Sequence, residues 1–205
     1  MNILIVDDHA VVRAGLKRLL APLARISIAE AATGRDAIAQ YRERRPDLVI
    51  LDLNLPGIGG LELLRRLMLE DPKACVLVFS MHAEAIYASR AIQAGARGYV
   101  SKNASPDELS QAIRRLGEGG RYIEGEIAQE LALLSVPEGQ PLQQLNEREL
   151  EILRLLGDGR SLAEIADQLG VGYKTVANTC SQIKGKLGVA RTADLIRLSI
   201  EMGVS

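Results

Sequence analysis

The chain has 205 residues, a length that suits one large domain or two small ones and allows a sizeable hydrophobic core. Its 25 lysines and arginines against 26 aspartates and glutamates leave a net charge of -1, which argues against coating of nucleic acid or anionic membrane by bulk charge but allows one local basic face. Aromatic residues make up 3% of the chain, so a platform that stacks single-stranded nucleic acid is not expected.

Cysteine content and hydropathy indicate the expected compartment. Two cysteines are too few for a disulfide framework or a four-thiolate zinc site. The first residues, MNILIVDDHA, lack the basic start of a signal peptide, and no apolar stretch approaches the roughly 18 residues that span a bilayer. We therefore expect a cytoplasmic protein that has no membrane partner.

Short apolar runs in the first half of the chain predict strands that are buried on both faces of a parallel sheet. They cover residues 2–6, 26–30, 48–51, 75–79 and 97–100. Apolar residues with helical spacing fill the segments between them, and the last of these segments opens with a capping box from Ser105 to Glu108. Five strands that alternate with five helices predict a doubly wound α/β domain over residues 1–120. The expected strand order is 2-1-3-4-5, under which the first and third strands are neighbours.

The second half of the chain predicts a linker followed by an all-α domain. Residues 121–141 are interpreted as the linker, with room for one short helix, because two prolines and a glycine fall near its end. Residues 142–205 carry helical patterns alone. Capping boxes that begin at Asn146 and Ser161 open the first two helices, and we expect four helices in this domain.

Acidic, basic and hydroxyl side chains follow the predicted strands at the point where each strand ends. Asp7 and Asp8 follow the first strand, Asp52 the third, Ser80 the fourth and Lys102 the fifth. Ligands of open α/β sheets bind beyond the carboxyl ends of the strands, so these side chains are expected to line one crevice. A single aspartate at a strand end is usually only a turn or cap residue, but the combination favours a functional site.

The chemistry of this set favours phosphoryl transfer. Three converging carboxylates either raise a pKa or hold a divalent cation, and hard oxygen ligands suit Mg²⁺. A metal-bound carboxylate can accept a phosphoryl group whose oxygens are stabilised by the Lys102 ammonium and the Ser80 hydroxyl.

Three segments together resemble the receiver domain of two-component response regulators: residues 5–9 (IVDDH), 51–56 (LDLNLP) and 95–102 (GARGYVSK). The resemblance implies that Asp52 is the phosphoacceptor. It implies further that Mg²⁺ is held by Asp8, Asp52 and the backbone carbonyl of Asn54, while Asp7 acts through water.

The same resemblance assigns Ser80 and Tyr99 as a switch pair. Ser80 is expected to move toward the new phosphoryl oxygens, and the Tyr99 ring is expected to turn inward into the vacated space. Asn103 follows Lys102 where many receivers have proline, so no cis-proline bend is assumed there. His82, two residues after Ser80, is interpreted as a solvated loop side chain.

Three residues of the second domain have the spacing of a helix-turn-helix. Ala166 is a small residue where two helices touch, Gly170 permits a left-handed turn, and Val176 anchors the next helix. That helix begins near Tyr173 and stops before Gly188. Its apolar stripe is expected to be buried and consists of Val176, Cys180, Ile183 and Leu187.

The opposite face of this helix is small and polar, which suits close approach to a major groove. Its candidate base-facing residues are Ala177, Asn178, Ser181, Lys184 and Gly185. Candidate phosphate contacts are Lys174, Thr175, Lys184, Lys186 and Arg191. Residues 171–205 hold five basic side chains against two acidic ones, which leaves a local charge of +3.

Residues 145–192 resemble the LuxR-type DNA-binding domain, and together with the receiver they make the chain similar to the NarL/FixJ family of response regulators. The family commonly has a basic residue and a histidine where this chain has Ala177 and Thr179, and a better N-cap residue where it has Gly172. These departures leave the base preference open and predict a weaker non-specific affinity for DNA.

The sequence therefore predicts a DNA-binding transcriptional regulator, not an enzyme, that a sensor histidine kinase switches by phosphorylating Asp52. A homodimer on two half-sites of double-stranded DNA is expected, with a candidate interface on the last helix at Ala193, Ile196 and Ile200. Two alternatives stay open: a stand-alone Mg²⁺-dependent phosphotransfer enzyme, and a constitutive DNA-binding protein whose receiver is not phosphorylated.

Overall fold

The computed structural model describes residues 1–22, 26–133 and 144–201. The chain forms two compact units, Met1–Leu134 and Ser135–Ser205. Residues 134–141 of the predicted linker, and residue 202 at the predicted end of the last helix, lie outside the described residues. Within the described ranges, no helix is both long and apolar enough to cross a bilayer.

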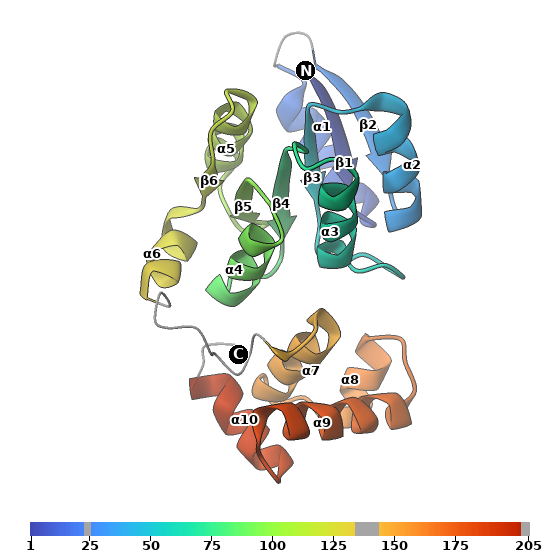
Figure 1. Cartoon of the computed structure of the whole chain (residues 1–205), viewed down its shortest axis with the longest axis vertical. Helices are drawn as coiled ribbons and strands as arrows, with labels where there is room; N and C mark the ends of the chain where they lie inside the picture. Colours follow the sequence, from blue (N-terminus) through green and yellow to red (C-terminus); the bar gives the residue numbers. More distant parts are fainter. Residues whose placement is uncertain (23–25, 134–143, 202–205) are drawn as a thin grey trace. The chain divides into compact units, whose positions relative to one another are not determined.

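The first unit is built on a parallel sheet in which the described strands lie in the order β2-β1-β3-β4-β5-β6 (Figure 1). The strands are β1 (Asn2–Val6), β2 (Ser27–Ala31), β3 (Leu48–Leu51), β4 (Val76–Ser80), β5 (Gly98–Ser101) and β6 (Tyr122–Ile123). The predicted order of the first five strands is confirmed. The described part of the chain has one strand more than the five predicted, namely β6. β6 has two residues and is too short to show a hydrophobic pattern.

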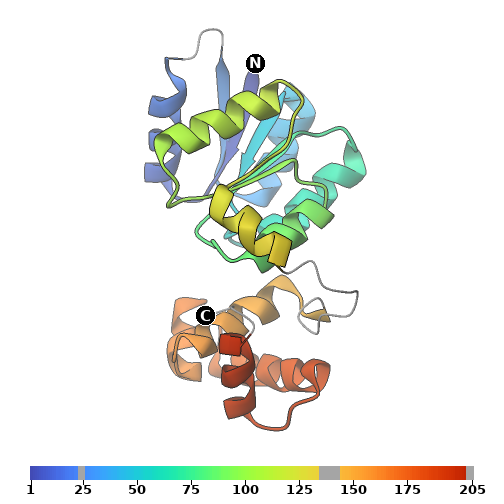
Figure 2. The ribbon, with the colours of Figure 1, turned by 90° about the vertical axis from the view of Figure 1, so that its left-hand side faces the viewer.

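Helices cover both faces of this sheet (Figures 1 and 2). They are α1 (Ala10–Leu20), α2 (Gly34–Arg44), α3 (Gly60–Glu70), α4 (Ala85–Gln93) and α5 (Pro106–Gly117). α1 and α5 pack side by side on one face, and α2, α3 and α4 pack in a row on the other. The central strands between them are therefore largely apolar, and every residue of β3 and β4 is buried.

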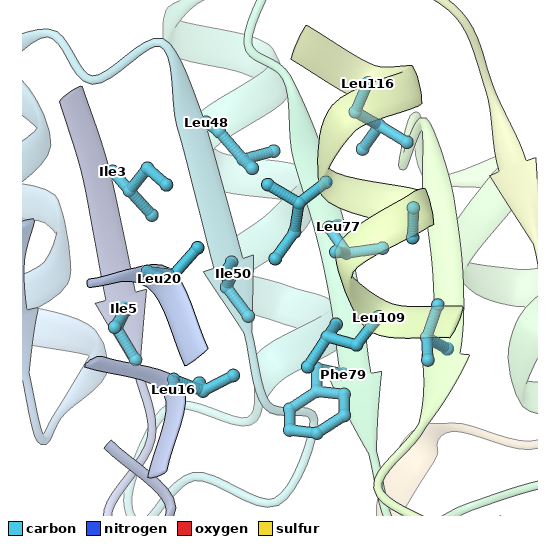
Figure 3. Packing of buried hydrophobic residues seen from close by; sticks show 13 residues of the cluster. Ile3, Ile5, Leu16, Leu20, Leu48, Ile50, Leu77, Phe79, Leu109 and Leu116 are labelled. Carbon is cyan, nitrogen blue, oxygen red and sulfur yellow. The ribbon is translucent and has the colours of Figure 1, made fainter. Parts of the chain in front are cut away.

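The core beneath α1 and α5 is a single cluster of aliphatic side chains with one aromatic ring (Figure 3). Leu16 and Leu20 of α1, and Leu109 and Leu116 of α5, lie over side chains from β1, β3 and β4. This packing holds the strands in register and fixes the positions at which they end. α5 begins with the predicted capping box, in which the Ser105 hydroxyl accepts from the backbone N–H of Glu108 at 3.2 Å.

Residues 121–133, predicted as part of the linker, belong to the first unit instead. β6 pairs in parallel with β5 at the edge of the sheet. α6 (Gly125–Leu133) packs against α4 (Figures 1 and 2) and buries Ile127. The first unit extends past the predicted end at residue 120, because its fifth strand offered an open edge to which a further strand could bond.

The second unit is helical throughout its described part, as predicted. It comprises α7 (Glu147–Gly157), α8 (Leu162–Gln168), α9 (Tyr173–Leu187) and α10 (Thr192–Glu201). Both predicted capping boxes are present, with Asn146 and Ser161 as the N-cap residues of α7 and α8. α7 packs against α10 and α9, and α8 packs against α9, around buried side chains that include Leu153, Ile165, Val176, Ile183 and Leu195.

Gly60, at the start of α3, marks a close approach between this helix and the loop after β3. A Cβ at Gly60 would lie 2.2 Å from the backbone oxygen of Asp52 and 2.5 Å from the Cα of Leu53. Because these are backbone atoms, the loop must shift, and we expect Gly60→Ala to lower the free energy of unfolding of the first unit by about 1–3 kcal/mol. Urea unfolding followed by circular dichroism measures this change.

Gly15→Ala is the matched control. A Cβ at Gly15, inside α1, meets no atom within 4 Å, so alanine should raise the free energy of unfolding by about 0.5–1 kcal/mol. An unchanged unfolding midpoint for Gly60→Ala would contradict the close approach.

Candidate functional site

The carboxyl ends of the parallel strands gather polar side chains at one edge of the sheet. Asp7 follows β1 directly, Asp52 follows β3, Ser80 ends β4 and Lys102 follows β5. Backbone hydrogen bonds continue the sheet at these positions: Asp52 N donates to Val6 O at 2.9 Å, and Lys102 N donates to Ser80 O at 2.7 Å. The register of the strands therefore determines the backbone position of each of these residues at the edge of the sheet.

Lys102 forms two ion pairs at the centre of the site. Its Nζ lies 2.7 Å from Asp7 Oδ2 and 2.6 Å from Asp52 Oδ2. Each aspartate is 2% exposed, and burial raises the pKa of Asp52 although Lys102 acts in the opposite direction. Burial disfavours the charge on Lys102 as well, but its bonds to the two carboxylates outweigh burial and raise its pKa. The structure thus places one ammonium between two desolvated carboxylates.

Asp8 and His9 complete an acidic cluster with Asp7 and Asp52. One ligand atom from each of these residues lies within 4.8 Å of the others. Asp8 is exposed, so the cluster opens to solvent on its side. Carboxylate oxygens in this arrangement suit a hard divalent cation, and the donor set therefore fits a metal ion. The Nδ1 atom of His9 lies 2.7 Å from Asp8 Oδ1. His9 is not among the predicted site residues, and its position directly after Asp8 is the sequence feature that could have indicated it.

His82 is a buried part of the site, and its interpretation as a solvated loop side chain is wrong. It is 4% exposed because its ring stacks on Tyr87 of α4, with the ring centroids 4.0 Å apart. Its Nε2 lies 2.9 Å from Asn54 Oδ1, and Asn54 N donates to Asp52 Oδ1 at 3.1 Å. His82 therefore supports the loop that follows Asp52.

Ser80 and Tyr99, the predicted switch pair, are both fully buried. His82 N donates to Ser80 Oγ at 3.3 Å, and the Tyr99 hydroxyl donates to His82 O at 2.7 Å. Burial raises the pKa of Tyr99 well above its usual value, so this hydroxyl keeps its proton at neutral pH. The backbone of His82 thus connects the two side chains.

α9 separates buried from exposed residues largely as its periodicity predicts. Val176, Cys180 and Ile183 are buried, whereas Leu187, near the end of the helix, is only half-buried. The exposed candidates for DNA contact are Lys174, Thr175, Asn178, Ser181 and Gly185. Ala177 and Lys184 are half-buried. Gly172 is the N-cap of α9 and provides no side-chain hydrogen bond there.

Lys186 and Arg191, both predicted to contact phosphates, pair with acidic residues in this structure. Lys186 Nζ lies 2.6 Å from Oε2 of Glu149, which is 2% exposed. Removal of Lys186 would leave a buried carboxylate without its cation, so Lys186 has a structural role, and its predicted phosphate contact stays a prediction. Arg191 pairs with Asp194 at 3.2 Å on the surface, where ion pairs are weak, and it stays a candidate for phosphate contact.

Two family models match the chain. Residues 3–114 match the response regulator receiver domain, and residues 143–199 match the luxR family of bacterial regulatory proteins. Response regulator UvrY of Escherichia coli K12 is 38% identical over 208 residues, which cover 100% of this chain and 95% of UvrY. Transcriptional activator protein ExaE of Pseudomonas putida is 42% identical over 210 residues, which cover 100% of this chain and 98% of ExaE. A solved complex of the response regulator RcsB with DNA has a TM-score of 0.62 and 25% identity, covering 96% of both chains.

Asp52→Asn is expected to raise the free energy of unfolding of the first unit at neutral pH, because it removes a buried charge. A carboxyl with a raised pKa binds its proton more tightly in the folded state, so wild type loses stability as pH rises from the unfolded-state pKa through the folded-state pKa. The gap between variant and wild type should therefore widen as pH rises from the unfolded-state pKa through the raised folded-state pKa, by about 1.4 kcal/mol for each unit of pKa shift. Chemical unfolding in metal-free buffer at several pH values measures this gap.

Asp107→Asn, which removes an exposed carboxylate at the start of α5 and no buried charge, is the matched control. If the gap for Asp52→Asn were constant or reversed, Lys102 would have to compensate fully for the burial of Asp52.

Proposed function

Because the chain belongs to the NarL/FixJ family of two-component response regulators, we propose that a sensor histidine kinase phosphorylates Asp52 and thereby controls the binding of the second unit to DNA. As a class, the chain is a DNA-binding transcriptional response regulator in which a receiver precedes a LuxR-type domain. The observation that carries the proposal is the Lys102 ammonium between Asp7 and Asp52 at the carboxyl edge of the sheet.

In the proposed reaction, a carboxylate oxygen of Asp52 attacks the phosphorus of a phosphohistidine on the kinase. The new O–P bond forms as the N–P bond breaks, and the kinase imidazole leaves with a proton taken from solvent. Lys102, 2.6 Å from Asp52 Oδ2, is placed to neutralise the phosphoryl oxygens. Ser80, at the end of the neighbouring strand β4, is placed to donate a hydrogen bond to one of them.

Mg²⁺ is the cation proposed for the acidic cluster. Asp8 and Asp52 would provide carboxylate oxygens and Asn54 its backbone carbonyl, while Asp7 would act through water. The hydrogen bond from Asn54 N to Asp52 Oδ1 supports this choice, since it keeps residue 54 beside the pocket. When bound, Mg²⁺ would supply positive charge next to the phosphoryl oxygens.

Ser80 and Tyr99 form the proposed switch. A phosphoryl group on Asp52 attracts the Ser80 hydroxyl, which then releases the backbone N–H of His82. The Tyr99 hydroxyl donates to the backbone carbonyl of His82, and the His82 ring stacks on Tyr87 of α4. A shift of the His82 backbone therefore changes the packing of Tyr99 and of α4. The surface formed by α4, β5 and α5 is remodelled as a result.

The second unit is proposed to read double-stranded DNA with α9 in the major groove. The RcsB–DNA complex supports this proposal, as does the small and polar exposed face of α9. Asn178 is the candidate for base reading and Lys174 the candidate for phosphate contact. Binding as a homodimer is proposed to use the α10 stripe of Ala193, Ile196 and Ile200, of which Ile200 is 58% exposed.

The chemistry of the chain is proposed to be limited to its own phosphorylation and dephosphorylation. The luxR-family match over residues 143–199 favours a regulator over a stand-alone phosphotransfer enzyme. The cation-bridged carboxylates favour a receiver that is phosphorylated over a constitutive DNA-binding protein.

Asp52→Asn should abolish phosphoryl incorporation from acetyl phosphate in the presence of Mg²⁺, because an amide oxygen is a far weaker nucleophile than a carboxylate. A phosphate-affinity gel and intact-mass measurement detect the product. Asp107→Asn, which changes an exposed aspartate in the first turn of α5 that is not among the proposed site residues, should be labelled like wild type. Undiminished labelling of Asp52→Asn would refute the assignment of the phosphoacceptor.

Two substitutions on α9 separate base reading from phosphate contact. Asn178→Ala should change the preference at one base pair by about 1–3 kcal/mol. Lys174→Ala should weaken binding to all sequences and reduce the salt slope by about 1. Selection from a randomised DNA pool and salt titrations measure these effects, and identical behaviour of the two variants would contradict the orientation of α9.

Lys186→Ala serves as the comparison in this experiment. It should lower the thermal stability of the second unit, because it removes the cation that pairs with the buried Glu149 carboxylate.

A further inference from the structure

Glu124 lies between β6 and α6 and is hydrogen-bonded to β5 at two positions. Its backbone N–H donates to Tyr99 O at 3.0 Å, and its carboxylate Oε2 accepts from Ser101 N at 2.6 Å. The second bond is charge-assisted, which makes it stronger than an ordinary backbone hydrogen bond. Ser101 is 1% exposed, so its N–H depends on this bond in place of water.

These two positions on β5 belong to the phosphoryl-acceptor pocket. Tyr99 is the proposed switch tyrosine, and Ser101 directly precedes Lys102, whose ammonium contacts Asp52. Any movement of the Lys102 backbone therefore acts on the N–H of Ser101 and on its bond to Glu124.

On the C-terminal side of Glu124, α6 begins at the next residue. α6 packs against α4 and buries Ile127, which is 2% exposed (Figure 1). α4 is linked to the same pocket, because its Tyr87 stacks on His82. α6 is the last described element of the first unit, and the next described helix along the chain, α7, belongs to the second unit.

We infer that Glu124 is a positioning residue that couples the Asp52 pocket to α6, and through α6 to the chain that continues into the second unit. The inference rests on the proposed function, since it concerns how phosphorylation of Asp52 reaches the DNA-binding unit. When Lys102 shifts from the carboxylates to the phosphoryl oxygens, Ser101 moves with it and Glu124 transmits the displacement to the start of α6. Glu124 touches no phosphoryl oxygen, so its loss uncouples the two units without preventing phosphorylation.

The test uses the full chain and three variants. Glu124→Ala removes the acceptor of the Ser101 N–H, whereas Glu124→Gln restores an acceptor, because a side-chain amide oxygen binds the same N–H. Glu126→Ala removes an exposed carboxylate two residues further on and is the matched control for charge. Each protein is treated with acetyl phosphate and Mg²⁺, its labelling is quantified, and its affinity for a DNA site selected with wild type is measured with and without phosphorylation.

We expect Glu124→Ala to be labelled like wild type while the ratio of its two DNA affinities falls by about 5-fold or more, the lower end of allosteric coupling. Glu124→Gln and Glu126→Ala should keep the wild-type ratio. A wild-type ratio in Glu124→Ala overturns the inference, and so does loss of labelling, since Glu124 would then be needed to build the pocket. If wild type itself is not labelled, or its DNA affinity does not respond, the proposed function fails first and the inference fails with it.

A second measurement needs no variant and is independent of the folding of Glu124→Ala. In an amide ¹H–¹⁵N correlation spectrum of the wild-type chain, the Ser101 N–H that donates to the Glu124 carboxylate should shift on phosphorylation together with the amides of α6. An unmoved Ser101 resonance, or α6 amides that do not respond, would overturn the inference.

Discussion

The candidate site of the first unit depends on one ammonium held between two buried carboxylates. Lys102 lies within 2.7 Å of both Asp7 and Asp52, each of which the sheet has removed from water. Isolated burial of either aspartate would be costly, and the lysine offsets part of that cost. Because the ammonium has two partners of the same charge, the phosphoryl group or divalent cation of the proposed function would change which oxygens it contacts without leaving it unpaired.

The pocket is connected to the rest of the unit through backbone groups more than through side chains. The N–H and C=O of His82 contact Ser80 and Tyr99, and the Glu124 segment contacts the backbone at residues 99 and 101. Backbone hydrogen bonds of this kind move with the loops that carry them. Consequently α4 and α6, which pack against each other, both receive a change that begins at Asp52.

In the second unit, a single ion pair changes the interpretation of the basic residues. Glu149 closes the capping box at the start of α7, and Lys186 near the end of α9 binds the same carboxylate. Helix α9 is thereby held to α7 by charge as well as by apolar packing. Lys174 in the first turn of α9 is exposed, and its contact with a DNA phosphate stays a prediction.

The sequence by itself determined the features whose physical cause is local. Continuous apolar runs and helical patterns predicted the first five strands and their helices, and the capping boxes depend on residues three apart. The residues that directly follow parallel strands lie at the same edge of the sheet. Helical patterns likewise predicted the helices of the second domain, whereas the order of the strands depends on which strands pack side by side and is shown by the tertiary structure.

Only the tertiary structure decided the burial of His82, the partner of Lys186, and the addition of β6 and α6 to the first unit. Each depends on a contact between segments far apart in the chain: His82 meets Asn54 across 28 residues, Lys186 meets Glu149 across 37, and Glu124 meets Ser101 across 23. Local periodicity carries no record of such contacts, because the free energy that selects them comes from burial and hydrogen bonding between elements after these have packed.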